Sequence, residues 1–251
     1  MSITIEDRIE HERAFHDERY RHDPRAAQDK FYNGLQESDA RFHELVAGFE
    51  PGQRVLELGC GIESLAFDLA RRGVEVVGID ISPVAVEKAT EAAAAQGLTN
   101  VSFQVMNAEV LEFTADSFDG VIGTAVLHHL DVAQAYSEMA RVLRPEGRVV
   151  FIEPLGHNPV INAYRRRTPE SRTDFEHPLR CEDFGLAQRF FGDVDVETFH
   201  LLAILTSPVA DRWWGRPIHR VLAALDRALL GLTERMRWQA WIAVAELRSP
   251  R

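Results

Sequence analysis

The stretch Arg54–Asp80, RVLELGCGIESLAFDLARRGVEVVGID, decides the fold of this chain. It begins with a short apolar run that ends at the turn Gly59-Cys60-Gly61. Apolar residues at helical spacing follow as far as Gly73, and a run of β-branched residues then ends at Asp80. This order predicts a strand, a tight turn, a helix and a second strand that lies parallel to the first.

Such a unit has a specific binding chemistry. Glycines lack a Cβ, so a ligand can approach the backbone closely. The helix after the turn directs its free N–H groups at that ligand. A carboxylate at the end of the second strand, here Asp80, can accept hydrogen bonds from both hydroxyls of a ribose. The unit therefore predicts a site for a nucleoside-containing cofactor at the carboxyl edge of a parallel sheet.

The motifs around this unit resemble those of class I S-adenosylmethionine-dependent methyltransferases. The sequence Glu57-Leu58-Gly59-Cys60-Gly61 is similar to their E-x-G-x-G motif, whereas an NAD-binding domain would have a third glycine where this chain has Ser64. Four later stretches agree with the family in order and spacing: Val77–Ser82, Ser117–Ile122, Leu127–Leu130 and Arg141–Gly147. The resemblance covers the chain from about residue 50 to residue 155.

The resemblance implies that S-adenosyl-L-methionine is the cofactor. It places Glu57 near the ammonium group of the cofactor and Asn107 near the adenine. The amide oxygen of Asn107 can accept a hydrogen bond from the adenine amino group. Glu63 stands where the family usually has another glycine, and we expect its side chain to turn outward. The full set of expected cofactor-binding residues is Glu57, Gly59, Cys60, Gly61, Asp80, Ile81, Asn107, Ala108 and Thr124.

Composition narrows the functional classes. With 251 residues the chain has room for one domain and some additions. A formal net charge of −11 argues against a nucleic-acid partner. No apolar run reaches the roughly 18 residues that a membrane span needs, and the charged amino terminus has no signal core. Two cysteines form neither a disulfide framework nor a metal cluster, so we expect a cytoplasmic protein without a metal site.

The alternation of strands and helices predicts an α/β fold with a Rossmann-like, doubly wound sheet. This sheet is expected to be mostly parallel with an antiparallel final strand, formed from Val194–Leu205 and Arg237–Leu247. Residues 1–49 are predicted to form a helical lid, with helices at Ile5–Tyr20 and Arg25–Phe49. Residues 50–251 are then the methyltransferase domain.

An insertion is expected at residues 207–236 of this domain. It contains Trp213-Trp214 and an amphipathic helix that carries Val221, Leu225 and Leu229. It could add to the core, cover a substrate, form the face of a homodimer or lie on a membrane surface. The pattern leaves these four readings open.

Methyl transfer requires an in-line approach to the methyl group and exclusion of water, and a general base helps with some acceptors. Substrate residues are therefore expected in the lid and at the carboxyl ends of two predicted strands, the fourth at Phe118–Gly123 and the fifth at Arg148–Glu153. His128 can act as a base or as an orienting residue, or can be a structural histidine. The candidate catalytic residues are His128, His157 and Glu153, and the candidate substrate-binding residues are Tyr20, Tyr32, His129, Arg172 and His177.

Taken with the resemblance, these features predict transfer of a methyl group to oxygen, nitrogen or carbon of a small organic acceptor in secondary metabolism. Two enzymatic alternatives stay open: a non-methylating cyclisation or rearrangement on the same fold, and methylation of a quinone-type lipid at carbon. A binding or scaffold protein without catalysis is a third.

Overall fold

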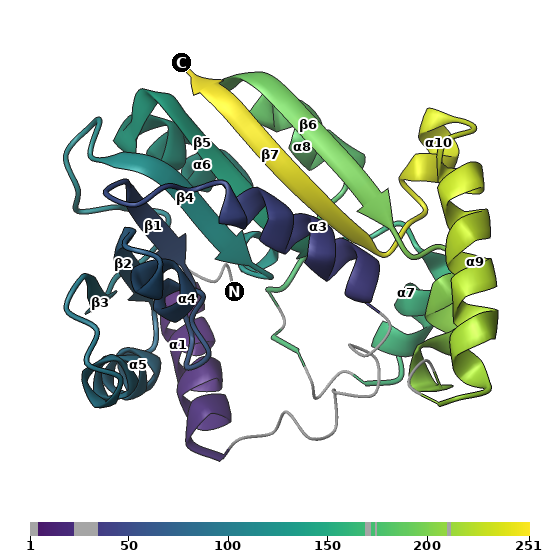
Figure 1. The fold of residues 1–251 in the computed structure, drawn as a ribbon, viewed down its shortest axis with the longest axis horizontal. Coiled ribbons are helices and arrows are strands. Elements are labelled where there is room, and N and C mark those ends of the chain that lie inside the picture. Colours follow the sequence, from purple (N-terminus) through teal and green to yellow (C-terminus); the bar gives the residue numbers. More distant parts are fainter. Residues whose placement is uncertain (1–4, 23–34, 169–171, 174, 210–211) are drawn as a thin grey trace.

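The computed structural model describes residues 5–22, 35–168, 172–173, 175–209 and 212–251. Its seven-stranded sheet has the order β3-β2-β1-β4-β5-β7-β6 (Figure 1). The strands are β1 (Arg54–Leu58), β2 (Glu75–Asp80), β3 (Val101–Val105), β4 (Phe118–Thr124), β5 (Leu143–Pro154), β6 (Phe191–Phe199) and β7 (Ile242–Pro250).

The first five strands are parallel, and β7 is antiparallel to both β5 and β6. This confirms the predicted doubly wound sheet with an antiparallel final strand. The chain builds β1, β2 and β3 outward in one direction and then returns to place β4 on the other side of β1. Ligands of such sheets bind beyond the carboxyl ends of the strands at this switch point. The fold therefore predicts a ligand site beyond the carboxyl ends of β1 and β4.

Helices cover both faces of the sheet (Figure 1). α3 and α4 pack on one face, and α6 and α8 pack on the other. The described helices are α1 (Ile5–His22), α3 (Gln36–Ala47), α4 (Ala66–Arg71), α5 (Pro83–Ala95), α6 (Val132–Val142), α7 (Pro159–Arg165), α8 (Cys181–Ala187), α9 (Gly215–Leu230) and α10 (Glu234–Arg237), with short 3₁₀ turns at Leu127–His129 and Ala203–Val209.

Short polar side chains start several of these helices. The Ser82 hydroxyl accepts a hydrogen bond from the N–H of Ala85, and Pro83 occupies the first helical position of α5. Asp131 caps α6 by accepting from the N–H of Gln134. Each cap satisfies an N–H that the helix itself leaves without a partner. Ser, Asp and a following Pro are the residue types that favour a helix start.

The amino-terminal region forms two helices with different roles. α1 matches the predicted helix Ile5–Tyr20 with two more residues at its end. The other predicted helix, Arg25–Phe49, is represented by α3, and residues 23–34 lie outside the described part of the chain. Phe42 and Val46 of α3 and the following Phe49 are buried against the sheet. Gly120 of β4 allows this packing, because a Cβ there would lie 2.2 Å from the Phe49 ring.

The last two strands are shorter than predicted. β6 ends at Phe199 because His200 adopts a left-handed conformation with φ of 67°. The buried carboxylate of Asp226 then accepts three backbone N–H groups, from Leu201, Leu202 and Ala203, and holds the chain in a turn. α10 occupies the start of the other predicted strand, so β7 begins only at Ile242.

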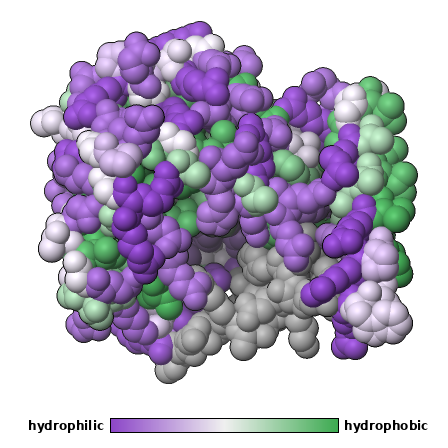
Figure 2. All heavy atoms as spheres, in the orientation of Figure 1, coloured by the Kyte–Doolittle hydropathy of each residue, from purple (hydrophilic) through white to green (hydrophobic). Residues whose placement is uncertain are grey.

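Between these strands, the predicted insertion contains α9 and α10. One side of α9 is buried through His219, Ala223 and Leu230. Its opposite side is apolar and exposed, and Figure 2 shows this hydrophobic surface at the right edge of the molecule; its members include Trp214, Ile218, Val221 and Leu225. None of the described helices is both long and apolar enough to cross a bilayer.

His200 connects α3 to the end of β6. The Ser38 hydroxyl donates to the carbonyl of Leu35, so it accepts its 2.9 Å hydrogen bond from Nε2 of His200. Burial and the nearby His219 lower the pKa of His200 from 6.5 to about 3. The folded protein therefore holds this imidazole neutral under conditions in which the unfolded chain would protonate it.

We expect this neutral histidine to destabilise the protein in mild acid. Its contribution is fully present above pH 6.5 and is lost as the pH falls from 6.5 toward 3. Between about pH 7.5 and about pH 5, that loss amounts to about 2 kcal/mol. The free energy of unfolding, measured with urea at both pH values, should fall by about 2 kcal/mol less in His200→Asn than in the unmodified protein. Asparagine tolerates the left-handed backbone and keeps a donor for Ser38.

The matched control is His43→Asn on the exposed side of α3. It should show the same pH dependence as the unmodified protein. If His200→Asn loses as much stability in mild acid as the unmodified protein, the attribution of this loss to His200 is wrong.

Candidate cofactor and acceptor site

A cavity of about 670 Å³ lies at the carboxyl ends of the parallel strands. The glycine turn, the end of β2 and the segment after β4 form its floor, and α1 and α3 contribute its walls. Its position is the one expected from the switch point of the sheet. We call the part lined by the glycine turn and Asp80 the cofactor half, and the part lined by His128 and Arg172 the acceptor half.

Asp80 holds the glycine turn in place. One carboxylate oxygen accepts from the N–H of Gly61 and the other from the N–H of Ser82, each at 2.9 Å. Gly61 has a φ of 53°, which glycine adopts without strain. Burial raises the pKa of Asp80, and the two N–H groups oppose this shift. The end of β2 thus presents a fixed, buried carboxylate to the cavity.

Glu57, at the end of β1, is a second buried carboxylate in the cofactor half. It accepts from the Ser64 hydroxyl and from the N–H groups of Leu65, at 2.9 Å, and Ala66, at 3.2 Å. Burial raises its pKa to about 7 against these hydrogen bonds. The motif residue therefore also caps the start of α4, a role that the sequence analysis did not include.

The remaining predicted cofactor residues line the same cavity: Gly59, Cys60, Ile81, Asn107, Ala108 and Thr124. Burial raises the pKa of the Cys60 thiol, which excludes a reactive thiolate. The side-chain oxygen of Asn107 already accepts from the N–H of Glu109 at 3.0 Å. Glu63 is exposed at the edge of the cavity, as expected for an outward side chain.

α1 covers this half of the cavity (Figure 1). Arg8 binds both carboxylate oxygens of Glu109, at 2.7 and 2.6 Å, and donates to the carbonyl of His129 at 3.0 Å. Asp17 accepts from the hydroxyl of Ser82. Tyr20 lies over the turn, because a Cβ added to Gly61 would be 3.0 Å from its hydroxyl. These contacts place α1 against the glycine turn and the segment after β4.

His128 is held between two carboxylates in the acceptor half. Its Nδ1 lies 2.7 Å from Glu153 and its Nε2 lies 3.2 Å from Glu176. The other oxygen of Glu153 accepts the N–H groups of Val126 and Leu127, each at 2.7 Å. Burial lowers the pKa of His128, but the two glutamates outweigh burial and raise it to about 9. Both ring nitrogens therefore carry protons, which favours an orienting residue over a general base.

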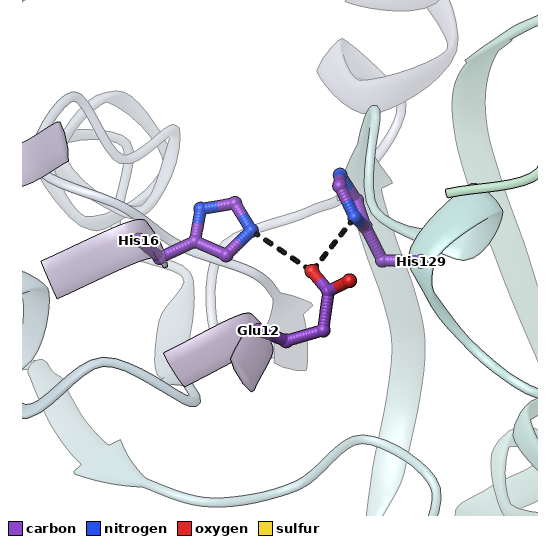
Figure 3. Close-up of side chains that lie close together, drawn as sticks. All are labelled: Glu12, His16 and His129. Carbon is purple, nitrogen blue, oxygen red and sulfur yellow. Dashed lines mark ion pairs between the residues drawn. The ribbon is translucent and has the colours of Figure 1, made fainter. Parts of the chain in front are cut away.

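His129 faces in another direction, toward α1. Its Nδ1 lies 3.1 Å from Oε2 of Glu12, and the Nε2 of His16 lies 3.6 Å from the same oxygen (Figure 3). Burial would raise the pKa of Glu12, but His129, His16 and the Thr173 hydroxyl hold it below its usual range. The sequence analysis missed Glu12 and His16. Their spacing of four residues, which places both on one face of a helix, was the available signal.

The other predicted residues divide into two groups. Arg172 lines the cavity, and its buried Nη1 has no hydrogen-bond partner among the described residues. The structure does not bring His157 and His177 to the described lining of the cavity. The Nε2 of His157 accepts from the N–H of Cys181 at 3.3 Å, and His177 exposes its side chain while its N–H binds the His128 carbonyl. Tyr32 lies outside the described residues.

Comparison with known proteins gives matches centred on the same segment. Residues 56–151 match the family model described as a methyltransferase domain. Aklanonic acid methyltransferase DauC of Streptomyces sp. (strain C5) is 40% identical over 108 residues, which are 41% of this chain and 49% of that protein. The ubiquinone/menaquinone biosynthesis C-methyltransferase UbiE of Geotalea daltonii is 34% identical over 125 residues, 48% of this chain and 53% of that protein. The chain thus spans about half the length of these curated relatives.

Solved structures share the fold over most of the chain. The phosphoethanolamine N-methyltransferase 2 of Haemonchus contortus, in complex with S-adenosyl-L-methionine, has a TM-score of 0.62 at 19% identity and covers 86% of this chain and 53% of its own. The [4+2]-cyclase SpnF has a TM-score of 0.56 at 20% identity and covers 84% and 81%. At these identities the likeness concerns the fold alone. The match over residues 56–151 is to a methyltransferase domain, and the fold around it is shared with these solved structures.

Proposed function

We propose that this protein transfers the methyl group of S-adenosyl-L-methionine to a small organic acceptor. The observation that carries the proposal is the pair of buried carboxylates, Glu57 and Asp80, beside the glycine turn at the switch point of the sheet. A ligand with a sulfonium, an ammonium group and a ribose diol complements this half of the cavity, because it supplies both positive charge and hydroxyl donors.

The electrostatics of the cofactor half support this choice. Burial raises the pKa of both Glu57 and Asp80, so in this cavity burial outweighs the hydrogen bonds that favour their charged forms. A bound cation would reverse that effect and favour ionised carboxylates. The phosphates of an anionic dinucleotide would not favour the ionised forms of these two carboxylates in this way. The charge distribution therefore favours a cationic cofactor at this glycine turn.

The acceptor half supports an acceptor that is largely apolar and has one acidic oxygen. Leu35, Phe42 and Ile161 contribute buried apolar side chains to the cavity. Arg172 contributes a buried N–H group without a described partner, which suits a carboxylate, phenolate or enolate. The names of the relatives point the same way, since DauC acts on an acid and UbiE in quinone biosynthesis. An organic acid or phenol of secondary metabolism is the proposed class.

In this mechanism the protein mainly aligns and encloses the reactants. The cofactor, when bound, supplies a methyl group on a cationic sulfur. Asp80 and the turn at Gly61 fix one end of the site, and Arg172 fixes the acceptor. α1 excludes water from above, anchored by Arg8 and Glu109. His128, clamped by two glutamates, keeps the loop after β4 in position beside the acceptor.

A second candidate is a non-methylating reaction, such as a cyclisation, on the same cofactor-binding fold. Two observations favour it: His128 does not present a free base, and the structural neighbours include a [4+2]-cyclase. Consumption of the methyl group separates the two. Formation of S-adenosylhomocysteine with an accepted substrate supports transfer, whereas turnover that leaves the cofactor intact supports the alternative.

The first prediction from this proposal concerns the cofactor. Calorimetric titration with S-adenosyl-L-methionine and with S-adenosylhomocysteine should show binding by the unmodified protein. Asp80→Ala should weaken both by about 10- to 100-fold, because charge-assisted hydrogen bonds to the ligand are lost. Asp80→Asn keeps an acceptor oxygen for one backbone N–H and should give an intermediate loss.

Asp193→Ala is the matched control, because it removes an exposed aspartate from β6 at the far edge of the sheet. It should bind both ligands like the unmodified protein. If the folded protein binds neither ligand, the proposed function is wrong.

The second prediction concerns the acceptor. Arg172→Met should raise the KM for an accepted organic acid or phenol by about 10-fold or more, because a charged hydrogen bond is lost. The affinity for S-adenosylhomocysteine should stay unchanged, since Arg172 lies in the acceptor half. Steady-state kinetics and calorimetry measure the two quantities. Arg216→Met, on the exposed side of α9, is the control, and an equal effect of both variants would contradict the role of Arg172.

A further inference from the structure

Three metal-ligating side chains converge where α1 meets the segment after β4. Glu12 and His16 come from successive turns of α1, and His129 comes from the end of the 3₁₀ turn (Figure 3). One ligand atom from each of them lies within 4.8 Å of the others. The cluster lines the cavity, and neither Glu12 nor His16 is used by the proposed methyl transfer. It therefore calls for an explanation of its own.

The distances fit a shared ion. Oε2 of Glu12 lies 3.1 Å from Nδ1 of His129 and 3.6 Å from Nε2 of His16. Nitrogen and oxygen ligands lie about 2.1 Å from a zinc-like ion, so two neighbouring ligands of a tetrahedral site are roughly 3.4 Å apart. The two measured separations bracket this value. Two of the three donor separations thus match the spacing of ligands around one ion, and the third, between the two imidazole nitrogens, is within 4.8 Å.

The hydrogen bonding of the cluster is incomplete in a way that an ion would satisfy. Oε2 of Glu12 and Nδ1 of His129 are both buried and form an ion pair at 3.1 Å, but neither makes a hydrogen bond of good geometry among the described residues. Only 5% of the Glu12 side chain is exposed. Buried polar atoms without partners are rare and costly in folded proteins. Two such atoms that face each other at 3.1 Å mark a position suited to a cation.

Surrounding contacts orient these ligands. The other oxygen of Glu12 accepts from the hydroxyl of Thr173, so Oε2 stays directed at the imidazoles. Arg8 donates to the backbone carbonyl of His129 and binds Glu109, which fixes α1 against the segment that carries the third ligand. The ring of Tyr20 stacks on that of His16, with centroids 6.0 Å apart. Such support from outside the ligand set is typical of metal sites in proteins.

The geometry points to a binding site for one divalent transition-metal ion, of the class of Zn²⁺, Co²⁺ and Fe²⁺, held by Glu12, His16 and His129. Two imidazoles and one carboxylate are a donor set that these ions prefer over Mg²⁺ or Ca²⁺. Three protein ligands leave at least one coordination position, which here faces the cavity. Water or an oxygen of a bound molecule would fill it.

Two neighbouring clusters fit an ion less well. His128, His129 and Glu176 also lie within reach of one another, but both ring nitrogens of His128 already face carboxylates. His157, Cys181 and Glu182 form the other group, in which Glu182 is exposed and His157 accepts from a backbone N–H. These two clusters supply the controls for a test.

The test uses the full chain, freed of metal with a chelator and then titrated with Zn²⁺ in a calorimeter. A parallel titration with Co²⁺ reports nitrogen and oxygen ligands through its visible absorption. We expect one ion per chain in the unmodified protein. Glu12→Gln, His16→Asn and His129→Asn should each weaken binding by about 100-fold or more, since each removes one of three ligands. Glu176→Gln and Cys181→Ser should bind like the unmodified protein.

Circular dichroism and thermal unfolding of the metal-free variants test whether each is folded. His16→Asn alters a half-buried side chain and is the variant least expected to disturb packing. The proposal is overturned if the unmodified chain binds no ion with defined stoichiometry. It is also overturned if Glu176→Gln or Cys181→Ser abolishes binding while Glu12→Gln does not. The titration needs neither cofactor nor acceptor, so its result is independent of the proposed methyl transfer.

Discussion

The carboxylate of Asp80 is the constraint on which the rest of the site depends. By accepting the N–H groups of Gly61 and Ser82, it ties the turn after β1 to the end of β2. Ser82 in turn caps α5 and donates its hydroxyl to Asp17 of α1. One side chain thus links the floor of the cavity, the neighbouring helix and the cover. A buried charge with several backbone donors can do this because its hydrogen bonds are short, strong and directional.

The sequence predicts the centre of this molecule well, because local patterns determine it. The strands from β1 to β4, the glycine turn and the caps at Ser82 and Asp131 follow from apolar periodicity and from residues that satisfy free N–H groups. The ends of β6 and β7 are harder to predict. β6 ends at Phe199, where His200 turns the chain, and Asp226, more than twenty residues away, holds that turn by accepting the next three N–H groups. Nothing in the local pattern of Val194–Leu205 encodes that contact.

The two adjacent histidines show the same limit within the site. The sequence indicates that His128 and His129 have different roles, because neighbouring residues point in different directions. It does not indicate which partners each one meets. Glu153 and Glu176 enclose His128, while Glu12 of α1 faces His129 from more than a hundred residues away. Likewise His157 looks site-like in a polar loop, yet in the structure it accepts the N–H of Cys181 at the start of α8.

α1 unites the two halves of the cavity. Towards its carboxyl end, Asp17 and Tyr20 lie against Ser82 and the glycine turn, while nearer its start Arg8 and Glu12 lie against Glu109 and the segment after β4. The helix is strongly polar, so its attachment depends on these charged contacts rather than on apolar burial. A ligand in either half would therefore add to the contacts that hold α1 in place, and each ligand would stabilise a cover that the other also needs. We therefore expect binding in the cofactor half and binding at the cluster of Glu12 to stabilise each other through α1.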